Sequence, residues 1–373
     1  MYLLKNILNM FKRGELGILW PFYLSRFIDA SFSLISAYAI LYLLDLGFSF
    51  FQVSIIFALS PIMSVIFEIP TGAIADIYGR KVSVFLSYLA SGIIMLLIPL
   101  SSNFYYLAFL FAIWGITQTL STGAYTAWVI DSLKQKRKSE LIDYYYSHDT
   151  SLANIGVVVA PLLAALVVTY LNMGYLFTIQ GITVLISGCV LLIAKEKFKK
   201  NHSHIKELFN QTIKQTKKSI RYGVDHPVIF KILLSSLFLM FVIGASGFLW
   251  QPYLKTFNIP LAYFGYVTSI AGFLSIFVPL ITHHFSKKFT KVTKYLLILI
   301  IAFIISLASI YFISNEYLAM MIVVILYVAI MFIAPIEEPF FQRFVPNRMR
   351  ATLGSFKSTT SQIGFALSTI IIG

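Results

Sequence analysis

The sequence has little charge for its length and almost no cysteine. Only 12% of the 373 residues are charged, about half of the fraction usual in soluble domains. The single cysteine, Cys189, lies in an apolar run, which excludes a disulfide framework and a cysteine metal site. A phosphate-binding loop of the form G-x-x-x-x-G-K-[ST] is absent too, so no ATP hydrolysis is expected. We expect no cleavable signal peptide, because the first apolar segment is long, follows Lys12 and Arg13, and lacks a small-residue cleavage pattern.

Apolar residues are abundant instead: 58% of the chain is hydrophobic and the mean hydropathy is +0.83. A chain this apolar is suited to lipid rather than to water. Runs of about 20 apolar residues, the length that crosses a bilayer as a helix, recur between short polar breaks. The sequence therefore predicts an all-α integral membrane protein with eleven spans, near 19–44, 53–71, 82–100, 104–130, 152–171, 175–194, 228–250, 263–284, 295–313, 317–338 and 351–373.

The lysines and arginines fall almost entirely on one side of this layout. Lys255 is the only one in a loop on the opposite side, and Arg26 lies within the first span. Since basic residues concentrate in cytoplasmic loops, we place the N-terminus in the cytoplasm and the chain in the cytoplasmic membrane. The net charge of +14 then reflects orientation in the bilayer, and no nucleic-acid partner is expected.

One long polar stretch, 195–226, separates residues 1–194 from residues 227–373. Within this stretch apolar residues recur at helical spacing between basic residues. The pattern predicts an amphipathic helix that lies on the anionic lipids of the inner leaflet. A solvated basic linker is the alternative.

The two halves share a short repeat. Ser147–Gly156 reads S-H-D-T-S-L-A-N-I-G, and Ser355–Gly364 in the second half reads S-F-K-S-T-T-S-Q-I-G. A parallel repeat of six plus six helices predicts twelve spans. The second bundle, which ends at Gly373, then has only five, so we expect a truncated chain that lacks the twelfth helix.

A motif lies in the turn between the second and third spans, where Glu68 to Lys81 reads E-I-P-T-G-A-I-A-D-I-Y-G-R-K. It resembles the G-x-x-x-D-x-x-G-R-K loop of the major facilitator superfamily of transporters, in the E-x-P-T-G-x-x-A-D form common among efflux permeases. The resemblance implies two pseudo-symmetric six-helix bundles, a monomer and no cofactor. The matching positions are Gly72, Asp76, Gly79, Arg80 and Lys81.

The resemblance also implies a role for this loop in conformational switching. Gly72 and Gly79 would allow close helix approach and a tight turn. Asp76 would lie against the amino end of the eleventh span, where free amides attract anions. Arg80 would pair with Asp131 at the end of the fourth span. These contacts would stabilise the state closed on the cytoplasmic side. An ordinary basic turn is the alternative.

The second half has a weaker copy of the loop, H-H-F-S-K-K at 283–288. We expect one of its lysines, Lys287 or Lys288, to pair with Glu337 or Glu338. The two histidines have no carboxylate or cysteine at ligand spacing, so no metal site is expected.

Two opposite charges, Arg26 and Asp29, stand in the first span, three residues apart on one face. A charge in hydrocarbon costs roughly 2.5–3.5 kcal/mol, so we expect them to pair or to line water. Asp29 is the first candidate for a proton-coupling site, because burial disfavours its charged form. A purely structural pair is the alternative. Glu68 is either a second proton site or, as we favour, part of the switching contacts.

Amide and aromatic side chains in or near the spans are candidates for a cavity that binds a moderately sized organic substrate. Each is equally compatible with a hydrogen bond between helices. The candidates are Tyr38, Trp114, Gln118, Asn154, Trp250, Gln251 and Gln362.

These features predict a secondary active transporter rather than an enzyme. We expect alternating access of two bundles about a central site, with export of an organic solute in exchange for protons. The export direction follows from the resemblance alone. A proton-coupled uptake permease and a non-transporting receptor or assembly protein remain the alternatives. A membrane enzyme is disfavoured, because all six histidines lie in or at cytoplasmic loops.

Overall fold

The computed structural model describes residues 11–196, 220–286, 301, 304, 312–346 and 350–373. Over these residues the regular secondary structure is entirely helical. The linker helix predicted at 195–226 and the span predicted at 295–313 lie largely outside the described residues, as do Lys287 and Lys288.

The first half forms helices that alternate with short turns. Its elements are α2 (Leu16–Ser31), η1 (Leu34–Ala37), α3 (Ala39–Asp45), α4 (Phe50–Tyr78), α5 (Arg80–Leu97), η2 (Ile98–Leu100), α6 (Phe104–Ser121), α7 (Ala124–Gln135), η3 (Ser139–Leu141), α8 (Ile142–Tyr170) and α9 (Gly174–Leu191). The described elements of the second half are α11 (Pro227–Lys255), α12 (Ala262–Ser275), α13 (Val278–Ser286), α15 (Glu316–Met331), α16 (Ala334–Phe344) and α17 (Arg350–Ile372).

Within the described ranges, seven helical segments are long and apolar enough to cross a membrane. An eighth results if the bent pair Leu16–Ala37 and Ala39–Asp45, which meet at 42°, counts as one span. The all-helical class is therefore confirmed. Eleven spans and a missing twelfth remain predictions.

The first span is interrupted between α2 and α3. Serine hydroxyls compete with helical backbone bonds in this stretch, and Ser36 Oγ lies 3.3 Å from the Ser33 carbonyl oxygen. A break inside a membrane leaves backbone groups that need other partners. One is supplied by α9, where Gln180 Oε1 accepts from the Ile35 N–H at 3.0 Å.

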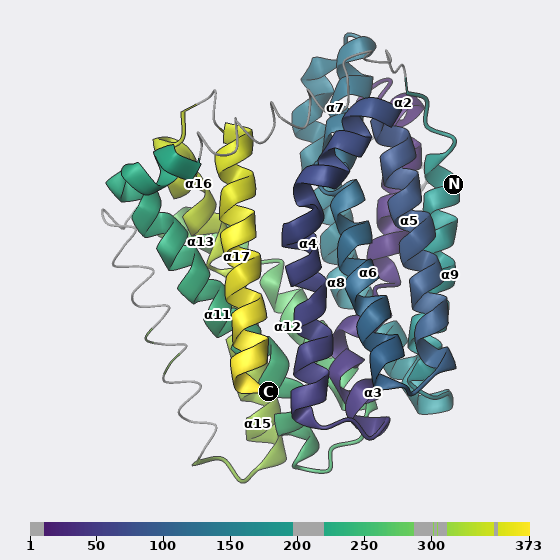
Figure 1. Cartoon of the computed structure of the whole chain (residues 1–373), viewed down its shortest axis with the longest axis vertical. Coiled ribbons are helices and arrows are strands. Elements are labelled where there is room, and N and C mark those ends of the chain that lie inside the picture. Colours follow the sequence, from purple (N-terminus) through teal and green to yellow (C-terminus); the bar gives the residue numbers. More distant parts are fainter. Residues whose placement is uncertain (1–10, 197–219, 287–300, 302–303, 305–311, 347–349) are drawn as a thin grey trace.

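The helices form two sets, which we call the N set (residues 11–196) and the C set (residues 220–373). Figure 1 shows α2 to α9 on one side and α11 to α17 on the other. The sets meet along two helix pairs, α8 with α12 and α4 with α17. Glycine permits close approach at the first pair, since a Cβ added to Gly272 would lie 2.7 Å from the Val157 carbonyl oxygen.

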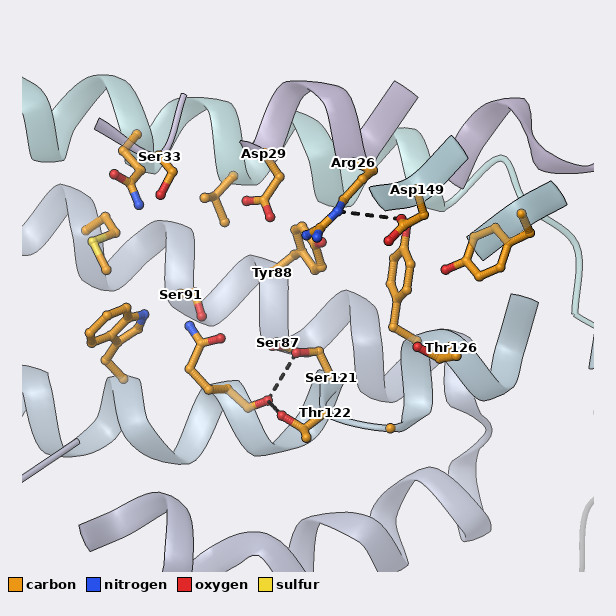
Figure 2. Close-up of a pocket in the computed structure, with 18 residues that line it drawn as sticks. Arg26, Asp29, Ser33, Ser87, Tyr88, Ser91, Ser121, Thr122, Thr126 and Asp149 are labelled. Carbon is orange, nitrogen blue, oxygen red and sulfur yellow. Dashed lines mark hydrogen bonds and ion pairs between the residues drawn. The ribbon is translucent and has the colours of Figure 1, made fainter. Parts of the chain in front are cut away.

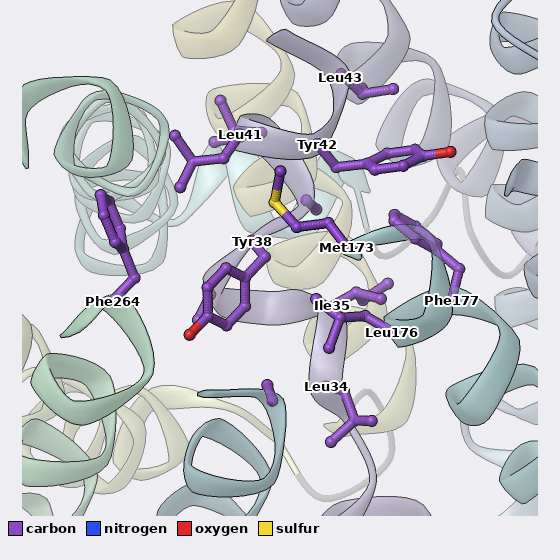
Figure 3. Close-up of a cluster of buried hydrophobic side chains, with 14 of the residues drawn as sticks. Leu34, Ile35, Tyr38, Leu41, Tyr42, Leu43, Met173, Leu176, Phe177 and Phe264 are labelled. Atoms are coloured by element: carbon purple, nitrogen blue, oxygen red, sulfur yellow. The ribbon is translucent and has the colours of Figure 1, made fainter. Parts of the chain in front are cut away.

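The molecule has two distinct ends. Helices α7 and α16 lie at the top of Figure 1, with the basic turn at 136–138 and Arg343, and we call this the basic end. Helices α3 and α15 lie at the bottom, which we call the far end. Both sets contribute to a buried apolar cluster around η1 and α3, where Figure 3 shows Phe177 of α9 and Phe264 of α12 on either side of the interrupted span. This packing holds the sets together near the far end.

Candidate functional site

Two cavities adjoin at the centre of the fold, because both are lined by Arg26, Asp29 and Ser33. The larger, about 460 Å³, is enclosed by the N set. The smaller, about 340 Å³, is lined by residues of both sets, including Trp250 and Tyr327 of the C set. The remaining lining residues of the larger cavity are Ser87, Tyr88, Ser91, Met95, Trp114, Gln118, Ser121, Thr122, Gly123, Tyr125, Thr126, Tyr145, Asp149, Gln180 and Val184.

Three ionisable side chains share one wall of the larger cavity (Figure 2). Arg26 Nε lies 3.5 Å from Asp149 Oδ1, so these residues form an ion pair. Asp29, the next residue along that wall, forms no ion pair or hydrogen bond within the described part of the chain. Of the two expected arrangements, pairing with each other or lining a polar cavity, the structure has the second: both Arg26 and Asp29 line the cavity, and Arg26 pairs with Asp149 instead. Asp149 takes the place of Asp29 because α8 begins at Ile142, well before the predicted span, and so carries Asp149 as a helical residue.

Hydroxyl and amide groups make up most of the remaining polar wall. Ser87 Oγ donates to the Thr117 carbonyl oxygen at 2.7 Å, and the hydroxyls of Ser91 and Thr117 share a hydrogen bond of 2.8 Å. Gln180, whose carbonyl oxygen is bound by Ile35, carries an amide NH₂ group in the same lining. The cavity thus offers several uncharged donors and acceptors.

The predicted cavity residues have different positions. Trp114 and Gln118 line the larger cavity, and Trp250 lines the smaller one. Gln362 lines a separate, mainly apolar cavity of about 180 Å³ between α4 and α17. Asn154 lies in α8 and lines none of these three cavities.

Tyr38 lies in a contact between the two sets rather than on a cavity wall. Its side chain is fully buried, its hydroxyl donates to the Leu261 carbonyl oxygen at 3.1 Å, and it accepts from the Gly265 N–H at 2.9 Å. The expected role of Tyr38 in binding is corrected accordingly, because the break in the first span directs this residue towards α12.

Gln251 also joins the two sets and is 2% exposed. Its NH₂ group donates to the Ser36 carbonyl oxygen and its Oε1 accepts from the Leu41 N–H, each at 3.3 Å. Gln251 thus satisfies backbone groups that the interrupted helix leaves free, and does not line the cavity as expected. Beside it, Lys255 forms an ion pair with Asp45. Together with Tyr38, these contacts close the far end.

Replacing Tyr38 with phenylalanine should weaken this closure. Two hydrogen bonds between the sets are lost, at about 1 kcal/mol each, which corresponds to a shift of roughly 30-fold towards a state open at the far end. The measurement is labelling of a cysteine at Leu41, which is 0% exposed, by a membrane-impermeant maleimide in a Cys189→Ser background. Tyr42→Phe is the matched control, since Tyr42 is buried nearby without a hydrogen bond to the C set. Equal labelling of the two variants would contradict the assignment.

Comparison with known families identifies this architecture. The model of the Major Facilitator Superfamily matches residues 19–369. The chain belongs to this superfamily. It is therefore a multi-pass membrane protein of a transporter family, and the expected family is confirmed, whereas the efflux subgroup stays a prediction.

Similar proteins agree with the assignment. The chain is 23% identical over 350 residues to the "Uncharacterized MFS-type transporter YxaM" of Bacillus subtilis (strain 168), covering 90% of this chain and 83% of that protein. Among solved structures, the nucleoside transporter NupG is similar with a TM-score of 0.75 at 15% identity, over 94% of this chain and 89% of that one. A D-xylose-proton symporter gives a TM-score of 0.68 at 12% identity, over 94% and 89%. Identities this low show a common fold.

The superfamily loop, Gly72–Lys81, covers the end of α4, the single residue Gly79 between the helices, and the start of α5. Gly79 has φ of +97°, a conformation that other residues rarely adopt, and this glycine ends α4. Arg80 forms an ion pair with Asp131 of α7. Lys81 Nζ donates to the carbonyl oxygens of Leu192 and Ala194. All of these contacts lie within the N set.

Two other positions of the superfamily loop make no such contact. Asp76 is exposed and, within the described residues, has neither a hydrogen bond nor an ion pair. A Cβ added to Gly72 would meet no atom within 4 Å, so the close helix approach expected at Gly72 is wrong for this conformation. The sets are linked on this side by Glu68, which accepts from the hydroxyls of Ser355 at 2.7 Å and Thr359 at 3.1 Å.

In the second half of the chain, the two acids Glu337 and Glu338 pair with a lysine of α17, and the pairing expected with Lys287 or Lys288 stays a prediction. Lys357 of α17 lies 3.3 Å from Glu337 and 3.0 Å from Glu338, and Glu337 also accepts from Ser236. Lysines of the loop at 283–288 lie outside the described residues. Lys357, on the neighbouring helix α17, therefore forms ion pairs with both acids.

Glu196 supports the superfamily loop, although sequence patterns give no sign of this role. Its carboxylate accepts from the backbone N–H groups of Arg80 at 2.9 Å and Lys81 at 3.1 Å, so it caps the amino end of α5. Glu196→Ala should lower the free energy of unfolding by about 1–2 kcal/mol. Thermal unfolding in detergent measures the effect, with the exposed Glu140→Ala as the control, for which about 0.5 kcal/mol or less is expected. A shift in the control as large as that of Glu196→Ala would refute the cap.

Proposed function

We propose that the chain is a secondary active transporter that exports a small polar organic solute across the cytoplasmic membrane in exchange for protons. The observation that carries the proposal is the group of Arg26, Asp29 and Asp149 on a cavity that reaches both helix sets. Charged groups at membrane depth are costly, and in membrane proteins they mark routes for ions or substrates.

Alternating access supplies the mechanism. Contacts of Tyr38, Gln251 and Lys255 join the sets at the far end, so this conformation is closed there. With the N-terminus in the cytoplasm, as the basic loops favour, the far end faces outwards. Rocking of the two sets then breaks these contacts and forms others at the basic end.

The superfamily loop supplies contacts for the opposite state. Asp76 has no partner among the described residues and lies on the same helix as Glu68, which already reaches α17. Closure at the basic end brings Asp76 towards the amino end of α17, where backbone N–H groups attract a carboxylate. In the present conformation, the ion pair with Asp131 fixes the position of Arg80.

The lining defines the class of solute. With Arg26, Asp29 and Asp149 all ionised, these charges sum to −1, so an anionic solute is disfavoured. Hydroxyl and amide groups suit a solute with several hydrogen-bonding groups, and the rings of Trp114 and Tyr88 suit a flat face. Structures of similar fold include transporters named for nucleosides and for D-xylose with protons. We therefore propose a neutral or singly cationic polar solute.

Asp29 carries the coupled proton in this proposal. Its carboxylate lacks an ion-pair partner in the described structure, whereas Asp149 has Arg26. A carboxylate without an ion-pair partner can take up and release a proton without breaking an ion pair, which suits Asp29 to this role better than Asp149. The direction of transport, export, follows from the resemblance of the E-x-P-T-G loop to efflux permeases.

The test is a panel of polar solutes assayed in proteoliposomes with a pH gradient imposed in either direction. Antiport predicts that the solute accumulates on the more acidic side, against its own concentration gradient. Accumulation on the more alkaline side indicates proton-coupled uptake and refutes the export direction. If no solute on the panel moves in response to either gradient, proton-coupled transport of this solute class is refuted.

A further inference from the structure

A second cluster of ionisable groups lies in the N set towards the basic end, separate from the cavity wall. Its centre is Glu15, the residue that directly precedes α2. Glu15 is 0% exposed. The carboxylate accepts from the Tyr23 hydroxyl at 2.6 Å and from the Lys12 N–H at 2.8 Å. His148 Nδ1 of α8 lies 2.7 Å from Glu15 Oε1. A fully buried carboxylate is costly unless every partner is in place, so this arrangement is specific.

The cluster lies next to the cavity along α8. His148 directly precedes Asp149, which lines the cavity and pairs with Arg26. Tyr145, another lining residue, stacks on Tyr23 with ring centroids 6.3 Å apart. The His148 side chain is 20% exposed, whereas that of Glu15 has no exposure. His148 is therefore partly exposed on one side and contacts a buried acid on the other.

Histidine suits the transfer of protons near neutral pH. With Nδ1 directed at Glu15, the other ring nitrogen is free to take up a proton. The other ionisable groups on the surrounding α2, α8 and preceding segment include Lys12, Tyr23, Arg26, Tyr144, Tyr145 and Asp149. Apolar side chains of η3 and α9, Leu141 and Leu191, complete the surrounding cluster.

We propose that His148, held by Glu15, is the site through which the coupled proton exchanges with the aqueous phase at the basic end. This inference rests on the proposed proton coupling. The O–H bond of the Asp29 carboxyl breaks, the Asp149 carboxylate accepts the proton, the free ring nitrogen of His148 holds it as an N–H, and water receives it. No electrons are transferred. Glu15 acts as a positioning residue that fixes the orientation of the ring.

The test compares the parent, His148→Gln and Glu15→Gln in proteoliposomes in which the pH on each side is set independently. His226→Asn is the matched control: His226 also lies at the basic end and caps α11 through Nδ1, a role that asparagine retains, but it forms no ion pair in the described structure. Two rates are measured with a solute that the parent transports: net transport driven by the pH gradient, and solute counterflow, which needs no net proton movement.

His148→Gln is expected to slow gradient-driven transport at least tenfold, to abolish its dependence on the pH at the basic end, and to leave counterflow within twofold of the parent. Glu15→Gln should also slow gradient-driven transport while leaving counterflow within twofold of the parent, because the ring of His148 loses the carboxylate that fixes its position. His226→Asn should behave as the parent.

Two results would overturn the inference while proton coupling stands. One is a proton-coupled parent whose His148→Gln variant keeps the same dependence on basic-end pH. The other is a proportional fall of counterflow and gradient-driven transport, which would assign His148 a structural role. A parent that does not respond to the gradient would instead refute the proposed function itself.

Discussion

Asp29→Asn should lose accumulation against a concentration gradient while it still exchanges solute. For one proton per solute, a pH difference of one unit supplies about 1.4 kcal/mol and sustains a solute ratio of about ten. Asparagine at this position has no proton to release, so the solute ratio in the variant should fall to about one. Counterflow should remain, because Arg26 and Asp149 still pair and the hydroxyl and amide wall is unchanged.

The matched control for this variant is Asp143→Asn. Asp143 is an exposed carboxylate in the first turn of α8 and lines neither central cavity, so its removal should leave the solute ratio unchanged. Both proteins are reconstituted at equal density and assayed with the solute and gradient that give the largest ratio in the parent. An Asp29→Asn variant that accumulates solute like the parent would show that the proton binds elsewhere.

Gly265→Val should prevent the far end from closing. A Cβ at Gly265 of α12 would lie 2.3 Å from the Pro161 carbonyl oxygen of α8 and 2.8 Å from the Tyr38 hydroxyl. The backbones of α8 and α12 cannot move far enough apart to relieve this overlap without separating the two sets. The variant should therefore populate a state open at the far end, with transport reduced at least about tenfold, the effect of 1.4 kcal/mol in a two-state equilibrium. Labelling of a cysteine at Leu41 should rise correspondingly.

Gly247→Val controls for the loss of a glycine in a helix of the C set. Gly247 lies in α11, and a Cβ there would meet no atom within 4 Å. In the Gly247→Val variant, the labelling of the cysteine at Leu41 and the transport rate should match those of the parent. If Gly265→Val leaves the cysteine at Leu41 as protected as in the parent, the seam between α8 and α12 does not control closure.

The apolar runs predicted the helical class well because a bilayer leaves few alternatives, and the family was predicted from the resemblance of the motif at Gly72–Lys81. Hydropathy predicted that the fifth span starts near 152, and so left Asp149 outside it. The helix in fact continues back to Ile142, but the polar side chains of Tyr144, His148 and Asp149 lower the mean hydropathy of its first part. A signal for Asp149 was nevertheless present. The repeat aligns Asp149 with Lys357, and the structure gives each of these residues an ion pair with a neighbouring helix.

The contacts at the far end were not predictable from local pattern. Tyr38 and Gln251 resemble ordinary cavity residues in the sequence, and their bonds depend on where the first span breaks. Glu15 and His148 are separated by most of the N set and meet only through the packing of α2 on α8. Long-range polar contacts of this kind need tertiary structure, because no periodicity specifies their partners.

The account depends on motion of the N set against the C set, and spin-label distances test it most directly. In a Cys189→Ser background, one labelled pair at Ser102 and Ser314 reports the far end, and another at Lys136 and Arg343 reports the basic end; all four positions are exposed. We expect lowered pH or added solute to change the distance distributions of the two labelled pairs in opposite directions, so that one end widens as the other narrows. Distances that stay fixed at both ends under every condition, or that widen and narrow together, would contradict alternating access.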